Sequence, residues 1–118
     1  MKMKLKEIQT LLDARGLTGE ENPELEVQSA CSSDMMSDVL AFPKEHMVLL
    51  TGLVNPQVIR TADMLDIRMV VFVRGKVPGE EALELARECG ISVLSTTYTL
   101  YVASGILFTN GLHNKLKG

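Results

Sequence analysis

Small, polar and cationic residues end or follow three apolar segments of this sequence, at residues 48–51, 69–73 and 92–95. Each segment has the pattern of a strand, and each is followed by a helical pattern. Because the carboxyl ends of parallel strands meet at one edge of a sheet, we expect the residues at these ends to converge there. Two cations beside helix starts suit a carboxylate or a phosphate group. The predicted ligand-binding residues are Thr51, Gly52, Asn55, Arg74, Gly75, Lys76, Ser95 and Thr96.

A second group of reactive side chains occupies a polar segment at the start of a predicted helix, residues 35–41. Asp34 and Asp38 are four residues apart and therefore share a helix face, where paired carboxylates can do acid–base work. A helix cap plus a solvated side chain is the more common arrangement. Cys31 is a possible nucleophile, but we expect its nearest candidate base, His46, at the opposite edge of the sheet. The secondary group is Cys31, Ser32, Ser33, Asp34 and Asp38.

Gly75-Lys76 after a strand is a reason to test for a P-loop. That motif needs a glycine where this chain has Val70 and a serine or threonine where it has Val77, so it does not occur. A GxGxxG dinucleotide loop is also missing from the sequence. The two cysteines and two histidines are far apart, without metal-ligand spacing. We therefore predict no metal site, no cofactor and no nucleophile–base pair.

Composition limits the remaining function classes. The 118 residues suit one domain, and 46% apolar residues with no tryptophan suit an aliphatic core. The formal net charge is −3 and the basic residues are scattered, which argues against a nucleic-acid partner. No apolar run approaches the ~20 residues of a membrane span, and no signal-peptide pattern is present. The expected location is cytoplasmic, where both thiols would be free.

Alternating strand and helix patterns predict an α/β fold with three layers, in which a mainly parallel sheet is flanked by helices. Asn55 is suited to cap a helix that starts at Pro56. A second helix is predicted over residues 79–89 and ends at Gly90. The last helix is predicted over residues 97–110.

The N-terminal third is less regular. Leu5, Ile8 and Leu12 share a face of a first helix, which Gly16 is expected to end. Residues 25–30 alternate as an edge strand would, and residues 31–34 follow as a polar loop. Ser33 or Asp34 is expected to cap the helix 35–41. We assign residues 1–118 to one domain, with about 1–112 ordered and 113–118 as a tail.

Three segments resemble stand-alone DRTGG-domain proteins of the type encoded near iron-only hydrogenase and histidine-kinase-like ATPase genes. They are residues 30–41, which include SDMMSDVLA, residues 49–62, LLTGLVNPQVIRTA, and residues 71–76, VFVRGK. The resemblance covers the chain from Leu5 to about Leu112. It implies a fold like the N-terminal domain of HPr kinase/phosphorylase, without the kinase chemistry of the separate P-loop domain. It further implies a regulatory role and dimerisation.

The chain departs from the residues that name this family. The Asp-Arg positions align with Val54-Asn55, and the Thr-Gly-Gly positions align with Val73-Arg74-Gly75. Only the last glycine is kept.

These observations predict a non-catalytic regulatory, ligand-binding and dimerisation domain with a small anionic ligand and a hydrogenase-related protein partner. Two alternatives stay open: a small-molecule enzyme that uses the loops at the sheet edge, and a redox accessory factor that acts through Cys31. We expect a homodimer, because the apolar residues of 35–42 cannot all lie on one helix stripe. Those residues are Met35, Met36, Val39, Leu40, Ala41 and Phe42.

Overall fold

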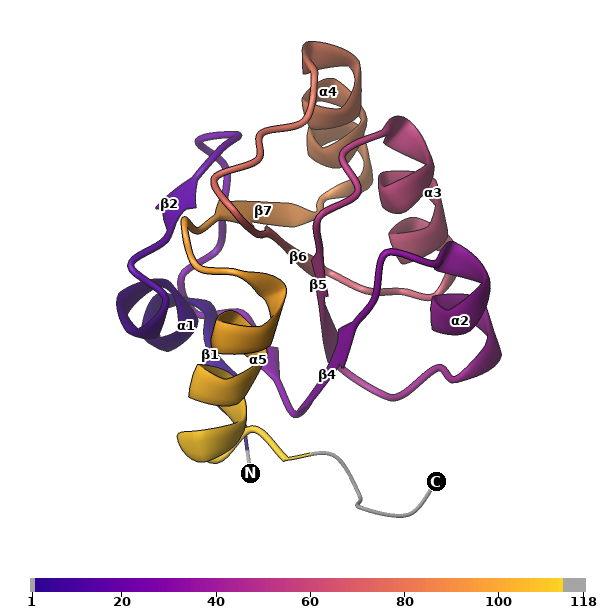
Figure 1. Ribbon diagram of the computed structural model, residues 1–118. Helices are drawn as coiled ribbons and strands as arrows, with labels where there is room; N and C mark the ends of the chain where they lie inside the picture. The colour runs from indigo at the N-terminus through magenta and orange to yellow at the C-terminus, as the bar shows by residue number, and fades with distance from the viewer. Residues whose placement is uncertain (1, 114–118) are drawn as a thin grey trace.

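Four parallel strands form the centre of the molecule in this computed structural model, which describes residues 2–113 (Figure 1). They lie side by side in chain order, and a short antiparallel strand, β2 (Arg15–Gly16), joins the far side of β7. The parallel strands are β4 (Ser29–Ser32), β5 (Met47–Thr51), β6 (Met69–Phe72) and β7 (Ser92–Ser95). The parallel arrangement predicted for residues 48–51, 69–73 and 92–95 is therefore confirmed.

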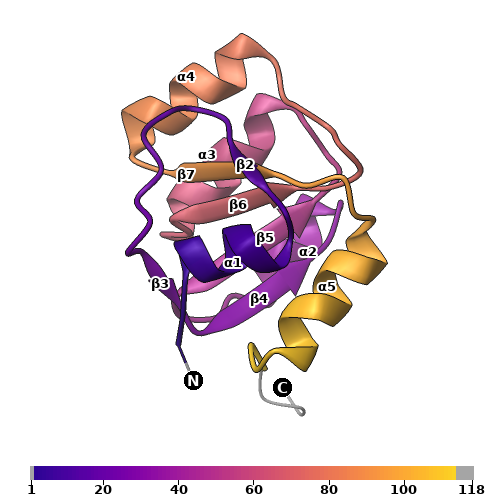
Figure 2. The same ribbon diagram turned by 90° about the vertical axis from the view of Figure 1, so that its left-hand side faces the viewer.

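Helices cover both faces of the sheet, as predicted (Figures 1 and 2). Right-handed crossovers between strands that are added in one direction must place their helices on the same face. That face carries α2 (Met36–Ala41), α3 (Pro56–Met64) and α4 (Glu80–Cys89). The opposite face carries α1 (Leu5–Leu11) and α5 (Leu100–Thr109). No helix among residues 2–113 has the length and apolarity to cross a membrane.

Alternating side chains of each strand belong to two separate hydrophobic cores, one on each face of the sheet. In β5, Val48 and Leu50 pack toward α1 and α5, whereas Met47 and Leu49 pack toward α2 and α3. Residues on both faces of β5, β6 and β7 are buried, as expected for strands covered on two sides. These buried strands position the loops at their carboxyl ends.

The predicted helix termini on the α3 and α4 side are confirmed. The Asn55 side chain accepts a hydrogen bond from the Gln57 N–H at 3.0 Å, and Pro56 is the first helical residue. Gly79 precedes α4, and Gly90 ends it with a left-handed φ of 70°. Local sequence therefore controls where these helices begin and end.

The predictions for the N-terminal third need two corrections. Gly16 does not end the first helix, because α1 stops at Leu11 and the chain turns at Asp13, whose φ is 48°. Gly16 instead pairs with Leu94 in the sheet. Residues 25–30 are not one strand: β3 (Glu26–Val27) pairs with β1 (Met3–Lys4), and the chain then crosses to β4.

Two further boundaries differ from the prediction. Residues 31 and 32 belong to β4 rather than to a loop, because they pair with Leu49 and Leu50 of β5. The last helix spans ten residues rather than fourteen, since the Thr99 side chain caps it by accepting from the Val102 N–H at 3.2 Å. Most of the predicted tail, residues 114–118, lies outside the described residues.

Candidate functional site

The register of the sheet brings the predicted ligand-binding residues to one edge. Thr51 of β5 pairs with Phe72 of β6, which pairs with Ser95 of β7, so the three strands end level with one another. The loop after β6 is then tied to the loop after β7. The Arg74 N–H donates to the Tyr98 carbonyl at 2.8 Å, and the Gly75 N–H donates to the Thr96 carbonyl at 2.8 Å.

Most hydroxyl groups of this cluster are already used within the fold. The Ser95 hydroxyl donates to the Lys76 carbonyl at 3.0 Å. The buried Thr96 hydroxyl donates to the Leu12 carbonyl at 2.6 Å and thereby joins β7 to the end of α1. The Asn55 side chain caps α3, as described above. These hydrogen bonds hold the loops in place, so a ligand would use the polar atoms at this edge that they leave free.

Asp34 joins the secondary polar group to the main cluster. Its Oδ1 accepts hydrogen bonds from the Gly52 N–H at 2.7 Å and from the Thr51 hydroxyl at 3.0 Å. Asp34 therefore does not cap α2, contrary to the prediction, because the end of β5 offers it two donors. Ser33 is not the N-cap residue either; its hydroxyl accepts from the N–H of Met35, the N-cap residue, at 3.0 Å.

Arg74 lies over Gly52. A β-carbon added to Gly52 would be 3.1 Å from Nη2 of Arg74 and 3.6 Å from both carboxylate oxygens of Asp34. A larger residue at position 52 would therefore displace the guanidinium group or the carboxylate. Arg74 also has a φ of 58° and Gly75 a φ of 67°, so two consecutive left-handed residues turn the loop here.

The cationic side chains at this edge are exposed. Arg74 and Lys76 make no side-chain hydrogen bond or ion pair with any residue that the structure describes. Arg15 adds a third exposed cation, because it pairs with Ser95 across β2 and β7. Sequence reasoning missed Arg15, since β2 has only two residues and no strand pattern. Three exposed cations at one edge suit the binding of an anion.

The remaining secondary residues have structural roles. The Ser32 and Ser104 hydroxyls lie 2.6 Å apart and link β4 to α5. Asp38 is in the first turn of α2, where a negative charge complements the helix dipole. Burial raises the pKa of the Cys31 thiol, a nearby Asp38 raises it further, and Lys44 lowers it.

No described histidine is positioned to activate Cys31. Cys31 pairs with Leu49, and His46 precedes Leu49 by three residues, which is about 10 Å along a strand. The ring of His113, the other histidine, packs beside Phe108 with the ring centroids 4.6 Å apart. No group of three or more possible metal ligands occurs among residues 2–113.

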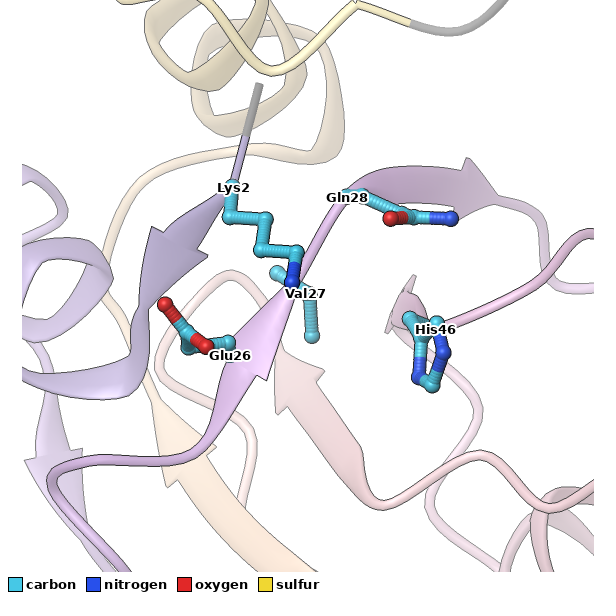
Figure 3. Close-up of a pocket in the computed structure, with 5 residues that line it drawn as sticks. All are labelled: Lys2, Glu26, Val27, Gln28 and His46. Carbon is cyan, nitrogen blue, oxygen red and sulfur yellow. The ribbon is translucent and has the colours of Figure 1, made fainter.

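Two hollows lie away from the predicted edge. One, of about 200 Å³, is lined by Lys2, Glu26, Val27, Gln28 and His46 near the amino end of β5 (Figure 3). A second, of about 440 Å³, lies between α1 and the end of α5 and is lined by Met3, Lys6, Glu7, Thr10, Leu11 and Asn110. Neither contains a predicted ligand-binding residue, so the predicted cluster and these hollows are separate candidates.

Comparison with known proteins identifies the fold. No protein-family model matches this sequence, and no curated protein matches it. A solved structure of the CBS and DRTGG domains of the regulatory region of Clostridium perfringens pyrophosphatase, complexed with the activator diadenosine tetraphosphate, is similar with a TM-score of 0.71. The sequences are 18% identical, and the match covers 88% of this chain and 45% of that one. This chain is an α/β domain with the fold of part of that regulatory region.

Proposed function

We propose that this chain is a DRTGG-type regulatory domain that binds a small anionic ligand at the edge where β5, β6 and β7 end. The observation that carries the proposal is the position of Arg74, whose guanidinium group lies over Gly52 and has no partner among residues 2–113. The similar fold belongs to a regulatory region that was solved with a nucleotide activator, which supports regulation by binding rather than by turnover.

The chemistry of the edge narrows the ligand class. Arg74 and Lys76 supply donors that suit phosphate oxygens, and the start of α3 adds a favourable dipole. Asp34 uses Oδ1 for both of its bonds within the fold, which leaves Oδ2 to accept from a ligand hydroxyl or amine. A phosphorylated metabolite or nucleotide with a hydroxyl group near its phosphate would suit both the two cations and the Asp34 carboxylate.

The homodimer belongs to the same proposal, as does a hydrogenase-related protein partner in the cytoplasm. The resemblance of residues 33–41 and 49–62 to hydrogenase-associated DRTGG proteins supports that setting. Large apolar side chains that are exposed on the single chain, such as Tyr101 and Phe108, support self-association.

A thermal-shift screen of nucleotides and phosphorylated metabolites, with diadenosine tetraphosphate among them, tests ligand binding. A ligand at 100 times its Kd adds about 2.7 kcal/mol to the free energy of unfolding, which raises Tm measurably. We expect Arg74→Glu to abolish this shift and to leave the unliganded Tm almost unchanged, because the side chain is exposed and unpaired.

Lys2→Glu is the matched control, since it makes the same charge change in the hollow of Figure 3. The shift should survive in Lys2→Glu. A shift lost in Lys2→Glu and kept in Arg74→Glu would move the site to that hollow, and equal shifts in wild type and Arg74→Glu would remove the proposal.

A further inference from the structure

Helix α5 is apolar on all sides although it lies on the surface of the molecule (Figure 2). Ala103 and Leu107 on its inner side are buried in the core with α1 and β5. On its outer side Tyr101 is 88% exposed, Phe108 49% and Val102 40%. Helices that are apolar all round are normally covered on all sides, so this outer side lacks a cover within residues 2–113.

Gly105 lies on the same outer side, four residues after Tyr101 and three before Phe108. A β-carbon added there would meet nothing within 4 Å, and the residue has no left-handed φ. A glycine inside a helix costs about 0.5–1 kcal/mol relative to alanine. Neither packing within the described residues nor backbone geometry calls for a glycine here. Close approach of another backbone to this position would call for one.

We propose that α5 packs antiparallel against α5 of a second copy of this chain, with a two-fold axis beside Gly105. The inference rests on the homodimer of the proposed function and assigns its interface. Tyr101 and Phe108 are equally distant from the midpoint between residues 104 and 105. A two-fold axis at this midpoint therefore places Tyr101 opposite Phe108 of the partner subunit, and the converse pair follows by symmetry.

The charge pattern allows α5 to pack against a second copy of itself. Residues 91–112 contain no Asp, Glu, Lys or Arg, so two such faces meet without like-charge repulsion although each chain carries a net charge of −3. The exposed apolar residues of α2 lack this property, because Asp38 and Lys44 lie among them. For this reason we assign the interface to α5 and not to the 35–42 segment that the sequence indicated.

The size of the face predicts the strength of the dimer. An aromatic side chain has a surface of about 200 Å². The exposed fractions of Tyr101, Phe108 and Val102 therefore leave roughly 300 Å² of apolar surface per copy. Stable interfaces bury roughly 800 Å² per partner. These three side chains supply less than half of that area, so the dimer should be weak and should dissociate on dilution.

Sedimentation equilibrium of the full chain from about 1 μM to about 1 mM tests this interface. The apparent mass should rise from 13.0 kDa toward twice that value with concentration. Tyr101→Glu and Gly105→Leu should both stay at the monomer mass. Their Tm at the lowest concentration should equal or exceed that of wild type, since neither side chain is needed inside the chain. Phe42→Glu, which changes an exposed residue beside α2, should associate as wild type does.

A wild-type mass of 13.0 kDa throughout would overturn the inference. So would a dimer that Phe42→Glu abolishes and Tyr101→Glu leaves intact. The experiment needs no ligand, so failure of the ligand screen does not affect its outcome. A monomer would in turn leave the ligand site at Arg74 open to its own test.

Discussion

At the scale of single residues, the hydrogen bonds of a side chain show whether it has a structural role or is available to a ligand. The sequence indicates Thr51 and Thr96 as ligand-binding residues, yet in the structure both hydroxyl groups donate hydrogen bonds within the fold. Arg74 and Lys76 also follow a strand in the sequence, but their side chains have no partner among the described side chains. Candidate residues of one chemical type are therefore distinguished by the hydrogen bonds that they have already made.

The Cys31 thiol should react slowly. Burial raises its pKa, and Asp38 acts in the same direction, so the thiolate fraction near pH 7 is below that of a free cysteine. In a Cys89→Ser background, alkylation of Cys31 by iodoacetamide should be slower than that of a free-cysteine control, and urea should restore the ordinary rate. Rapid alkylation at about pH 6 would instead support a redox role.

At the scale of elements, one carboxylate helps to hold a loop on the sheet. Glu21 accepts hydrogen bonds from the Thr18 N–H at 2.9 Å, from the Gly19 N–H at 3.1 Å and from the Val93 N–H of β7 at 3.5 Å. Partial burial by itself would raise the pKa of Glu21, but the hydrogen bonds from Thr18 and Val93 outweigh it and lower the pKa. The loop that contains Glu21 is thus docked on β7.

Glu21→Gln should lower the free energy of unfolding by roughly 1 kcal/mol at about pH 7, because the charged acceptor is lost. A folded-state pKa below the unfolded value of about 4.3 means that this stability is complete above the unfolded value and is lost as the pH falls through the folded one. Urea unfolding should therefore show a stability gap from wild type at pH 7 that narrows once the pH is below about 4.3. Glu20→Gln, which changes an exposed neighbour with only a 3.8 Å ion pair to Arg87, should have little effect at either pH. A gap independent of pH would contradict the role given to the Glu21 charge.

At the scale of the whole molecule, stability depends on the two cores that the sheet separates. Val71 in β6 is fully buried and belongs to the core shared with α1 and α5. Val71→Asp would bury an unpaired charge, which costs several kcal/mol and should unfold the domain. Val77→Asp, in the exposed loop after β6, should remain folded by circular dichroism. A Val71→Asp protein with the wild-type Tm would show that this core is not what holds the fold.

The sequence by itself determined the elements whose signals are local. The apolar strands β5, β6 and β7, the Asn55-Pro56 start of α3 and the Gly90 end of α4 all follow from patterns within a few residues. Parallel order also followed, because helices alternate with these strands. The convergence of Thr51 and Ser95 at one edge is a consequence of that order.

Only the tertiary structure decided the features that depend on partners far away in the chain. Asp34 turns from α2 to the end of β5 because Thr51 and Gly52 offer it donors seventeen and eighteen residues away. Arg15 lies at the candidate site because the two-residue strand β2 pairs with β7. The outer side of α5 is exposed because the core holds its opposite side, and a sequence that is apolar all round does not say which side that is. In each case the stabilising contact joins residues that are far apart in the sequence, and no local sequence pattern predicts such a contact.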